Sequence, residues 1–165
     1  MANKIDQIAA EERWKIASNS LTAAVTAYGE VLKGAIGDDK FFEFLKSLYS
    51  QAGASAKQFA ESLSISVENA EGIAEALLTF ALATMGPDFE FEDVEVSEDK
   101  CVGRTTKCPW YDRYKEQGVS EMTCNVGHQA WGEGVIGNLN SNYSFTLTKS
   151  IPTGDEYCEY VIERK

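Results

Sequence analysis

The sequence of 165 residues is poor in basic side chains, in histidine and in long apolar runs, and each shortage excludes a class of protein. It has 15 Lys and Arg against 26 Asp and Glu, and the resulting net charge of −11 repels nucleic acid phosphates and anionic lipids. Its longest apolar run, AEALLTFALATM, is too short to span a bilayer, and its N-terminal stretch has no apolar core of a secretory signal. We therefore expect a cytoplasmic protein that binds neither nucleic acid nor membrane.

The four cysteines also lack the spacing of a metal knuckle, because the sequence contains no CxxC pair. In a reducing compartment such cysteines are expected to be thiols, metal ligands or nucleophiles rather than disulfides. A chain of this length buries enough surface to fold without a disulfide or a structural metal. The sequence predicts a single domain over residues 1–165, with a helical part over 1–86 and a sheet- and site-bearing part over 87–165.

The first half of the sequence predicts three helices. Apolar residues recur at helical spacing over 7–34 and again over 40–62, where Gly53 is a weak point. A third helix starts after Ser66, ends at Gly86 before a proline, and is apolar nearly all round, so we expect it to be central. The residues expected to face the core from the first two helices are Ile8, Trp14, Ile16, Leu21, Val25, Tyr28, Val31, Leu32, Phe41, Phe44, Leu45, Leu48, Tyr49 and Phe59.

After residue 87 the apolar period changes from helical to alternating. The alternation predicts a strand over 89–96 with a bulge near Asp93, an antiparallel partner over 100–107, and a second hairpin formed by 143–147 and 157–163. The predicted fold class is α+β. In it, an N-terminal helical layer packs on a small antiparallel sheet of two hairpins, with two short helices between the hairpins.

The stretch 107–140 concentrates the residues that carry chemistry. It holds two of the four cysteines, the only histidine, two of the three tryptophans and five of the thirteen glycines. Pro109 is typical of a first helical turn, and Gly118 is a natural residue to end that helix. Cys108 would then lie at a helix N-terminus, where the helix dipole favours the reactive thiolate.

A second site helix is predicted to follow, with Ser120 as its N-cap. Cys124 and His128 stand four residues apart and therefore share one face of this helix. The glycines of the run HQAWGEGVIGN predict that the helix breaks up before a loop.

Three interpretations of the cysteines and the histidine stay open. In the catalytic one, Cys108 or Cys124 attacks an electrophilic carbon or activates water, and His128 transfers protons near neutral pH. In the metal one, Cys108, Cys124, His128 and Cys158 bind zinc, iron or an iron-sulfur cluster. In the third, the cysteines are small buried hydrophobic residues and the histidine is part of a pocket wall. No cofactor is favoured.

Other side chains near this stretch suit substrate binding. Trp110, Tyr114 and Trp131 are candidates to line an aromatic pocket for a flat ring, although aromatics at helical spacing are more often part of a core. Arg104 is a candidate to hold a substrate carboxylate by a charge-assisted hydrogen bond, although a solvated surface charge is its commoner role.

Several motifs occur in a fixed order along the second half of the sequence. They are Lys107-Cys108-Pro109-Trp110, then Lys115 to Gly118, then Cys124, and finally Gly154-Asp155 leading to Cys158-Glu159-Tyr160. In these motifs the sequence resembles the L-2-amino-thiazoline-4-carboxylic acid hydrolase family, whose members open a cyclic amidine ring by hydrolysis. Cys101, and a histidine four residues after Cys124, depart from the family pattern.

The resemblance implies a hydrolase that acts on a cyclic amidine or another C–N bond of a small molecule. The order of helices before sheet also resembles vinyl reductase-like ligand-binding domains. That likeness implies an alternative, a non-catalytic sensor domain that binds a small molecule or a metal. In both cases the apolar N-terminal helices are expected to form a homodimer face.

Overall fold

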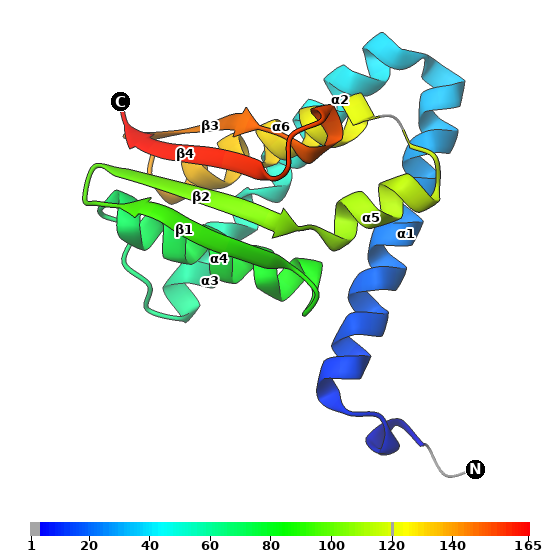
Figure 1. Ribbon diagram of the computed structural model, residues 1–165, viewed down its shortest axis with the longest axis horizontal. Coiled ribbons are helices and arrows are strands. Elements are labelled where there is room, and N and C mark those ends of the chain that lie inside the picture. Colours follow the sequence, from blue (N-terminus) through cyan, green and yellow to red (C-terminus); the bar gives the residue numbers. More distant parts are fainter. Residues whose placement is uncertain (1–3, 120) are drawn as a thin grey trace.

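The computed structural model describes residues 4–119 and 121–165, and it confirms the α+β fold (Figure 1). The N-cap predicted at Ser120 lies outside these residues. In the described part, no helix is long and apolar enough to cross a membrane. The helices are η1 (Ile5–Gln7), α1 (Ala10–Ile36), α2 (Asp38–Ala52), α3 (Ala54–Ser62), α4 (Ala70–Met85), α5 (Pro109–Glu116), α6 (Glu121–Leu139) and η2 (Ile151–Thr153). The strands are β1 (Glu90–Val96), β2 (Lys100–Lys107), β3 (Tyr143–Lys149) and β4 (Cys158–Arg164).

The strands form one antiparallel sheet in the order β1-β2-β4-β3. The two predicted hairpins are therefore joined side by side through β2 and β4, with Cys101 opposite Ile162. The register shifts between Asp93 and Glu95, which confirms the predicted bulge in the edge strand β1. Helices lie against one face of the sheet, with α4 touching β2 and β4 and α6 touching β3 (Figure 1).

Alternation along the two central strands decides what faces the helices. Cys158, Tyr160 and Ile162 of β4 are all buried on this inner face, as their shared period predicts. Opposite Tyr160, β2 carries Gly103, where an added Cβ would come within 2.3 Å of the tyrosine hydroxyl oxygen. Glycine at this position therefore makes room for the phenol ring.

The central helix α4 confirms its predicted place in the core. Its N-cap is Asn69, whose side chain accepts a hydrogen bond of 2.9 Å from the N–H of Gly72, so the helix begins later than Ser66 suggests. It ends at Gly86, whose φ of 99° suits only glycine. Ile73 of this helix is fully buried, at 0% exposure, in the cluster between α4, α6 and the sheet.

The helix α6 runs unbroken through its four glycines, so the predicted break after His128 is wrong. These glycines allow close packing instead. A Cβ on Gly134 would lie 2.6 Å from the backbone of Ser50, and one on Gly53 would lie 2.3 Å from the backbone of Gly134. The predicted weak point at Gly53 is also confirmed, because the chain there divides into α2 and α3.

The helix α1 forms where it is predicted but turns a different face to the protein. Its buried residues are Ser18, Thr22 and Thr26, and each hydroxyl donates to a backbone carbonyl within the same helix. The apolar face assigned to the core is exposed, with Leu21 at 56% and Tyr28 at 77%. Other predicted core residues that prove exposed are Ile8, Trp14, Ile16, Val31, Phe44 and Leu48.

Candidate functional site

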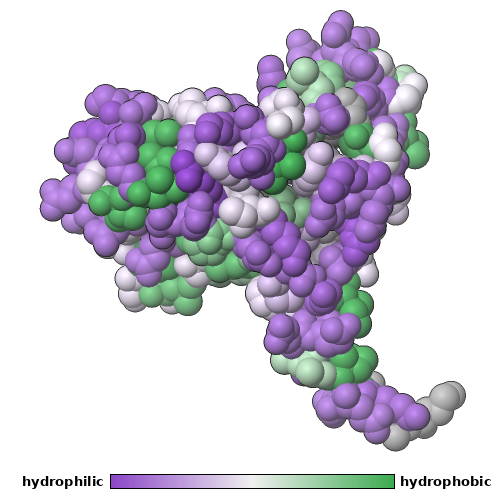
Figure 2. Space-filling model, viewed as in Figure 1, coloured by the Kyte–Doolittle hydropathy of each residue, from purple (hydrophilic) through white to green (hydrophobic). Residues whose placement is uncertain are grey.

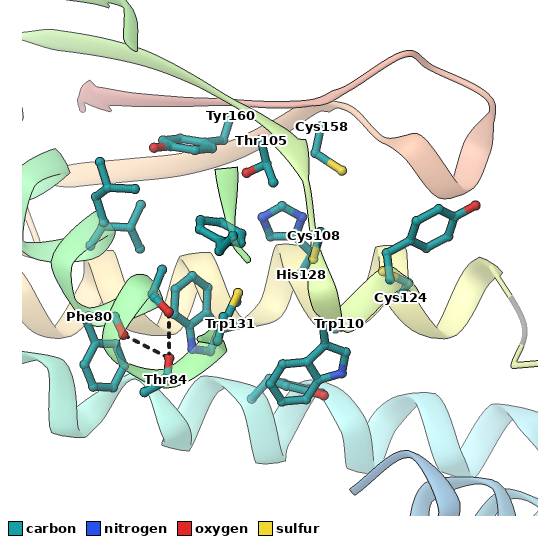
Figure 3. A pocket seen from close by; sticks show the side chains of 18 of the residues that line it. Phe80, Thr84, Thr105, Cys108, Trp110, Cys124, His128, Trp131, Cys158 and Tyr160 are labelled. Carbon is teal, nitrogen blue, oxygen red and sulfur yellow. Dashed lines mark hydrogen bonds between the residues drawn. The ribbon is translucent and has the colours of Figure 1, made fainter. Parts of the chain in front are cut away.

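A partly open cavity of about 340 Å³ lies between the inner face of the sheet and the helices α4, α5 and α6 (Figure 3). Aromatic, aliphatic and thiol side chains form nearly all of its wall, and the side chain of Leu21 reaches it from α1. None of the residues that line it is Asp, Glu, Lys or Arg. The cavity is therefore an apolar and uncharged compartment.

The structure brings the three predicted catalytic residues to this cavity (Figure 3). Cys108 lies where β2 passes into α5, and Cys124 and His128 lie one turn apart on α6. The predicted aromatic residues also reach the wall, Trp110 and Tyr114 from α5 and Trp131 from α6. Six residues from one stretch of sequence thus converge on one space.

His128 is held as a neutral imidazole. Burial lowers its pKa to about 4, so the ring is uncharged at neutral pH. Its ring centre lies 6.0 Å from that of Phe145, and neither ring nitrogen has a hydrogen-bond partner among the described residues. A neutral imidazole offers one N–H donor and one acceptor nitrogen, and here both are available to a bound molecule.

Cys108 lies at the N-cap of α5, which confirms the predicted helix start. Burial nevertheless raises the pKa of its thiol to about 11, and this outweighs the amides of Trp110 and Tyr111, which favour the thiolate. The thiolate expected from the helix dipole is therefore not favoured at neutral pH. Removal from water destabilises the anion more than the amides of the first helical turn stabilise it.

The other two cavity thiols are also neutral. Burial raises the pKa of Cys124 and of Cys158, and the nearby thiol of Cys108 raises that of Cys124 further. Cys158 accepts a hydrogen bond of 3.3 Å from the N–H of Ile151. Cys101 is buried on the same face of the sheet but does not line the cavity.

The predicted alternative metal ligands all face the cavity, yet they are not arranged as a ligand set. Cys108, Cys124, His128 and Cys158 come from α6, from β4 and from the start of α5. Within residues 4–119 and 121–165, no group of three or more His, Cys, Asp or Glu side chains is placed to hold a metal ion. The geometry therefore offers no support for the zinc or iron alternative.

Arg104, predicted to hold a substrate carboxylate, does not line the cavity. It stands on β2 next to Thr105, and successive side chains of a strand point to opposite faces, so Thr105 lines the cavity and Arg104 faces away. Its guanidinium donates to Glu159 at 2.8 Å and lies 4.4 Å from the ring centre of Tyr157. This arginine belongs to an ion pair on the open face of the sheet.

Part of the wall is not apparent from the concentrated stretch of sequence. Phe80 of α4 stacks on Trp131 with ring centres 6.3 Å apart, and Phe145 of β3 stacks on Tyr160 of β4 at 5.5 Å. Thr105 adds a hydroxyl on the sheet side. The signal for Thr105 and Tyr160 is the period of two along their strands, but only the pairing of β2 with β4 brings them together.

Trp110 and two tyrosines close the end of the cavity nearest α2. The ring of Tyr49 meets that of Trp110 edge-on at 6.3 Å, and Tyr114 lies beside Tyr49. The indole N–H of Trp110 is buried and has no hydrogen-bond partner among the described residues. Tyr49 and Tyr114 also line a second cavity of about 290 Å³ between α1 and α2, so they form the partition between the two.

The family model of L-2-amino-thiazoline-4-carboxylic acid hydrolase matches residues 18–162. A search of curated proteins finds no match to the chain.

Two solved structures share the fold. One is the phenol-responsive sensory domain of the transcription activator PoxR with phenol, at TM-score 0.62 and 11% identity, covering 87% of this chain and 74% of that one. The other is a trafficking protein particle complex subunit 3 from Naegleria fowleri covalently bound to palmitic acid. Its TM-score is 0.65 and its identity 14%, covering 92% of this chain and 96% of that one.

Proposed function

The chain belongs to the L-2-amino-thiazoline-4-carboxylic acid hydrolase family, and from that premise we propose that its cavity binds a small, uncharged ring compound. The observation that carries the proposal is the absence of any charged side chain among the residues that line the cavity. Burying an ion without a partner costs far more free energy than burying a neutral ring. The compartment therefore selects for neutral molecules.

The size of the cavity fits such a ligand. A volume of about 340 Å³ lies at the small end of the range of roughly 300 to 1,000 Å³ that is usual for small-molecule sites. Stacked pairs such as Phe80 with Trp131 and Phe145 with Tyr160 offer flat faces against which a ring can pack. The wall thus suits a single aromatic or heterocyclic ring better than a polar metabolite.

One structural neighbour supports a ring compound as the ligand, and the other supports only an apolar lining, because palmitic acid has no ring. The PoxR sensory domain is a phenol-responsive protein seen with phenol, and the Naegleria subunit carries palmitic acid. By comparison, the compound in the family name is a carboxylic acid, for which the lining of this cavity provides neither Lys nor Arg. We therefore favour a neutral ligand over that acid.

Several side chains of the wall carry polar groups, among them Thr105 and Trp110, and among the described residues His128 is the one with two free ring nitrogens. His128, whose two ring nitrogens are unpartnered in the described part, is suited to hydrogen-bond a hydroxyl or an amine of the ligand. One such hydrogen bond, left unmade in a buried site, is worth about 1 to 2 kcal/mol, or roughly tenfold in affinity.

The proposal is tested by titrating the protein with phenol and with toluene while recording its tryptophan fluorescence. His128→Leu is expected to weaken phenol binding about tenfold and to leave toluene binding nearly unchanged, because only phenol carries a hydroxyl. Arg104→Gln is the matched control, since that side chain lies on the other face of the sheet. Failure of both compounds to bind at millimolar concentration would refute the proposal.

A second candidate function is hydrolysis of a C–N bond in a bound cyclic amidine. The observation that favours it is the family match together with Cys108, Cys124 and His128 on one cavity wall. In this scheme a thiol adds to the amidine carbon, and His128 passes the thiol proton to the ring nitrogen. The ring C–N bond then breaks, and water displaces the thiol from the carbon to release the opened product. Because the thiols are neutral before binding, the amidine nitrogen would have to receive the proton as the bond forms.

The hydrolase candidate is tested with 2-amino-thiazoline, which has the amidine ring without a carboxylate, and with its 4-carboxylic acid. Mass spectrometry should detect a ring-opened product one water heavier. His128→Asn and Cys124→Ser should each lower kcat by ~100-fold or more, and their double variant should be little slower than the slower single one. A protein that binds phenol but turns over neither amidine is a binding domain.

A further inference from the structure

An unbroken heptad stripe runs along the solvent side of α1. Seven of its residues follow the alternating spacing of three and four that defines the seam of a coiled coil. All of them are exposed, including Leu21 at 56%, Tyr28 at 77% and Val31 at 74%. Figure 2 shows this helix projecting from the body of the protein, with separate hydrophobic patches among hydrophilic surface. The seven residues of the α1 stripe are Trp14, Ala17, Leu21, Ala24, Tyr28, Val31 and Ala35.

The sizes of the side chains in the α1 stripe suit an antiparallel pairing of two copies of the helix. Three of the four residues in one set of heptad positions are large, the fourth being Ala35, and the other set holds only alanine and valine. In an antiparallel pair whose two-fold axis passes between residues 22 and 23, Leu21 faces Ala24 and Tyr28 faces Ala17. Trp14 then faces Val31 in the same way. Each large side chain thus meets a small one, as interdigitated packing requires.

The surroundings of the α1 stripe favour a second copy of the chain. The net charge of −11 would oppose self-association, but no charged residue lies in the stripe. The neighbouring solvent-side positions Ser20, Ala27 and Gly34 are uncharged as well. The seam from Trp14 to Ala35 is about 33 Å long at 1.5 Å per residue. An interface of this kind falls at the small end of specific interfaces, which predicts a reversible dimer rather than an obligate one.

Leu21 connects the α1 stripe to the binding site. Its side chain lines the cavity from α1 and is at the same time the central large residue of the stripe. The face of α1 that rests on the protein is the polar row Ser18, Thr22 and Thr26. At the N-terminal end of the stripe, the indole N–H of Trp14 donates a hydrogen bond of 3.2 Å to the carbonyl of Ala83 in α4. A helix from a second copy would cover Leu21 from outside and complete the cavity wall at that point.

We propose that the chain forms an antiparallel homodimer through the α1 stripe, and that this seam closes the cavity over Leu21. The dimer itself does not depend on the nature of the ligand. The closure over Leu21 rests on the proposed binding function, and it predicts that an occupied cavity strengthens the dimer.

Sedimentation equilibrium of the full chain over about 1 to 200 µM tests the seam. The parent protein should show a monomer–dimer equilibrium, and Ala24→Glu should weaken dimerisation at least 100-fold because it places two buried carboxylates in the seam. Ala54→Glu is the matched control: it adds the same charge to an exposed alanine of α3, outside the helix that forms the seam. A strictly monomeric parent, or equal loss in both variants, would overturn the proposal.

The direction of the seam is tested by cross-linking. In the variant Ala17→Cys with Tyr28→Cys, mild oxidation should join position 17 of one copy to position 28 of the other, as peptide mapping by mass spectrometry would show. Bonds joining each position to itself would mean a parallel seam and would contradict the proposed packing. Unchanged dimerisation on addition of phenol, in a protein that binds phenol, would reject the closure over Leu21 while leaving the binding function intact.

Discussion

The two longest described helices, α1 with 27 residues and α6 with 19, contrast in how their sequences relate to their burial. Helix α1 has a regular apolar stripe, and this stripe faces solvent while Ser18, Thr22 and Thr26 rest on the protein. Helix α6 is interrupted by glycines and is polar at many positions, yet it packs against α2, α3 and β3. Between these two helices, a regular apolar stripe therefore does not identify the one that is built into the core.

The contrast has a physical cause. Small residues let two backbones approach, so the glycines of α6 bring it against α2 at a distance that no larger residue permits. A stripe of large apolar residues needs a surface to cover it, and on α1 the described part of the chain leaves most of the stripe exposed, although Leu21 lines the cavity. Periodicity predicts that a helix is amphipathic, but not which molecule covers its apolar face.

Truncation of a buried leucine should show the largest difference between the two helices. Leu139 of α6 is 4% exposed, and Leu139→Ala should lower the free energy of unfolding by about 2 to 5 kcal/mol through the cavity that it leaves. Tyr28→Ala removes a larger side chain from α1 but should change that free energy by only about 0.5 kcal/mol in the monomer. Urea denaturation at low protein concentration measures both, and equal losses would remove the contrast.

Adding a methyl group to a glycine of α6 should change the free energy of unfolding by less than Leu139→Ala does, and the sign should depend on the position. Gly134→Ala forces a Cβ to within 2.6 Å of the backbone of Ser50, and this overpacking should cost about 1 to 3 kcal/mol. Gly137→Ala is the matched control, because no atom lies within 4 Å of its Cβ position and alanine favours helix by about 1 kcal/mol. The two thermal unfolding temperatures should move in opposite directions. A stabilising Gly134→Ala would show that the helices are not in close contact.

The buried histidine of α6 should make stability depend on pH. Its pKa is about 4 in the folded protein and about 6.5 in the unfolded chain. Its contribution is therefore complete above pH 6.5 and is lost as the pH falls from 6.5 towards 4. Between pH 7 and pH 5 the parent should lose about 2 kcal/mol more than His128→Gln in urea titrations. Parallel losses in the two proteins would mean that the imidazole is accessible to water.

The fold class could be read from the sequence because it depends on local signals. The change from helical to alternating period after residue 87, the helix end at Gly86 and the weak point at Gly53 all occur in the structure as predicted. The part of the site drawn from one stretch, including Cys124 and His128, could also be found, because residues one turn apart on a helix share a face in any fold.

The rest of the site depends on contacts between distant segments. Which face of β2 meets the helices depends on the register in which β2 pairs with β4. The sequence alone therefore could not show that Thr105, and not Arg104, faces the cavity. The pKa of Cys108 could not be read from its place at a helix start, because the depth of its burial is set by other elements. The covered face of α1 depends on the whole molecule in the same way.

The residue type at position 103 should affect which ligand sizes fit the cavity, although Gly103 itself does not line it. Gly103 lies behind Tyr160, and a Cβ there would meet the tyrosine hydroxyl at 2.3 Å. Because Tyr160 lines the cavity and Gly103 does not, any side chain at position 103 would push the phenol ring inward and shorten the space in front of it. Related proteins that differ at this one strand position should therefore differ in the length of molecule they accept, with the rest of the wall unchanged.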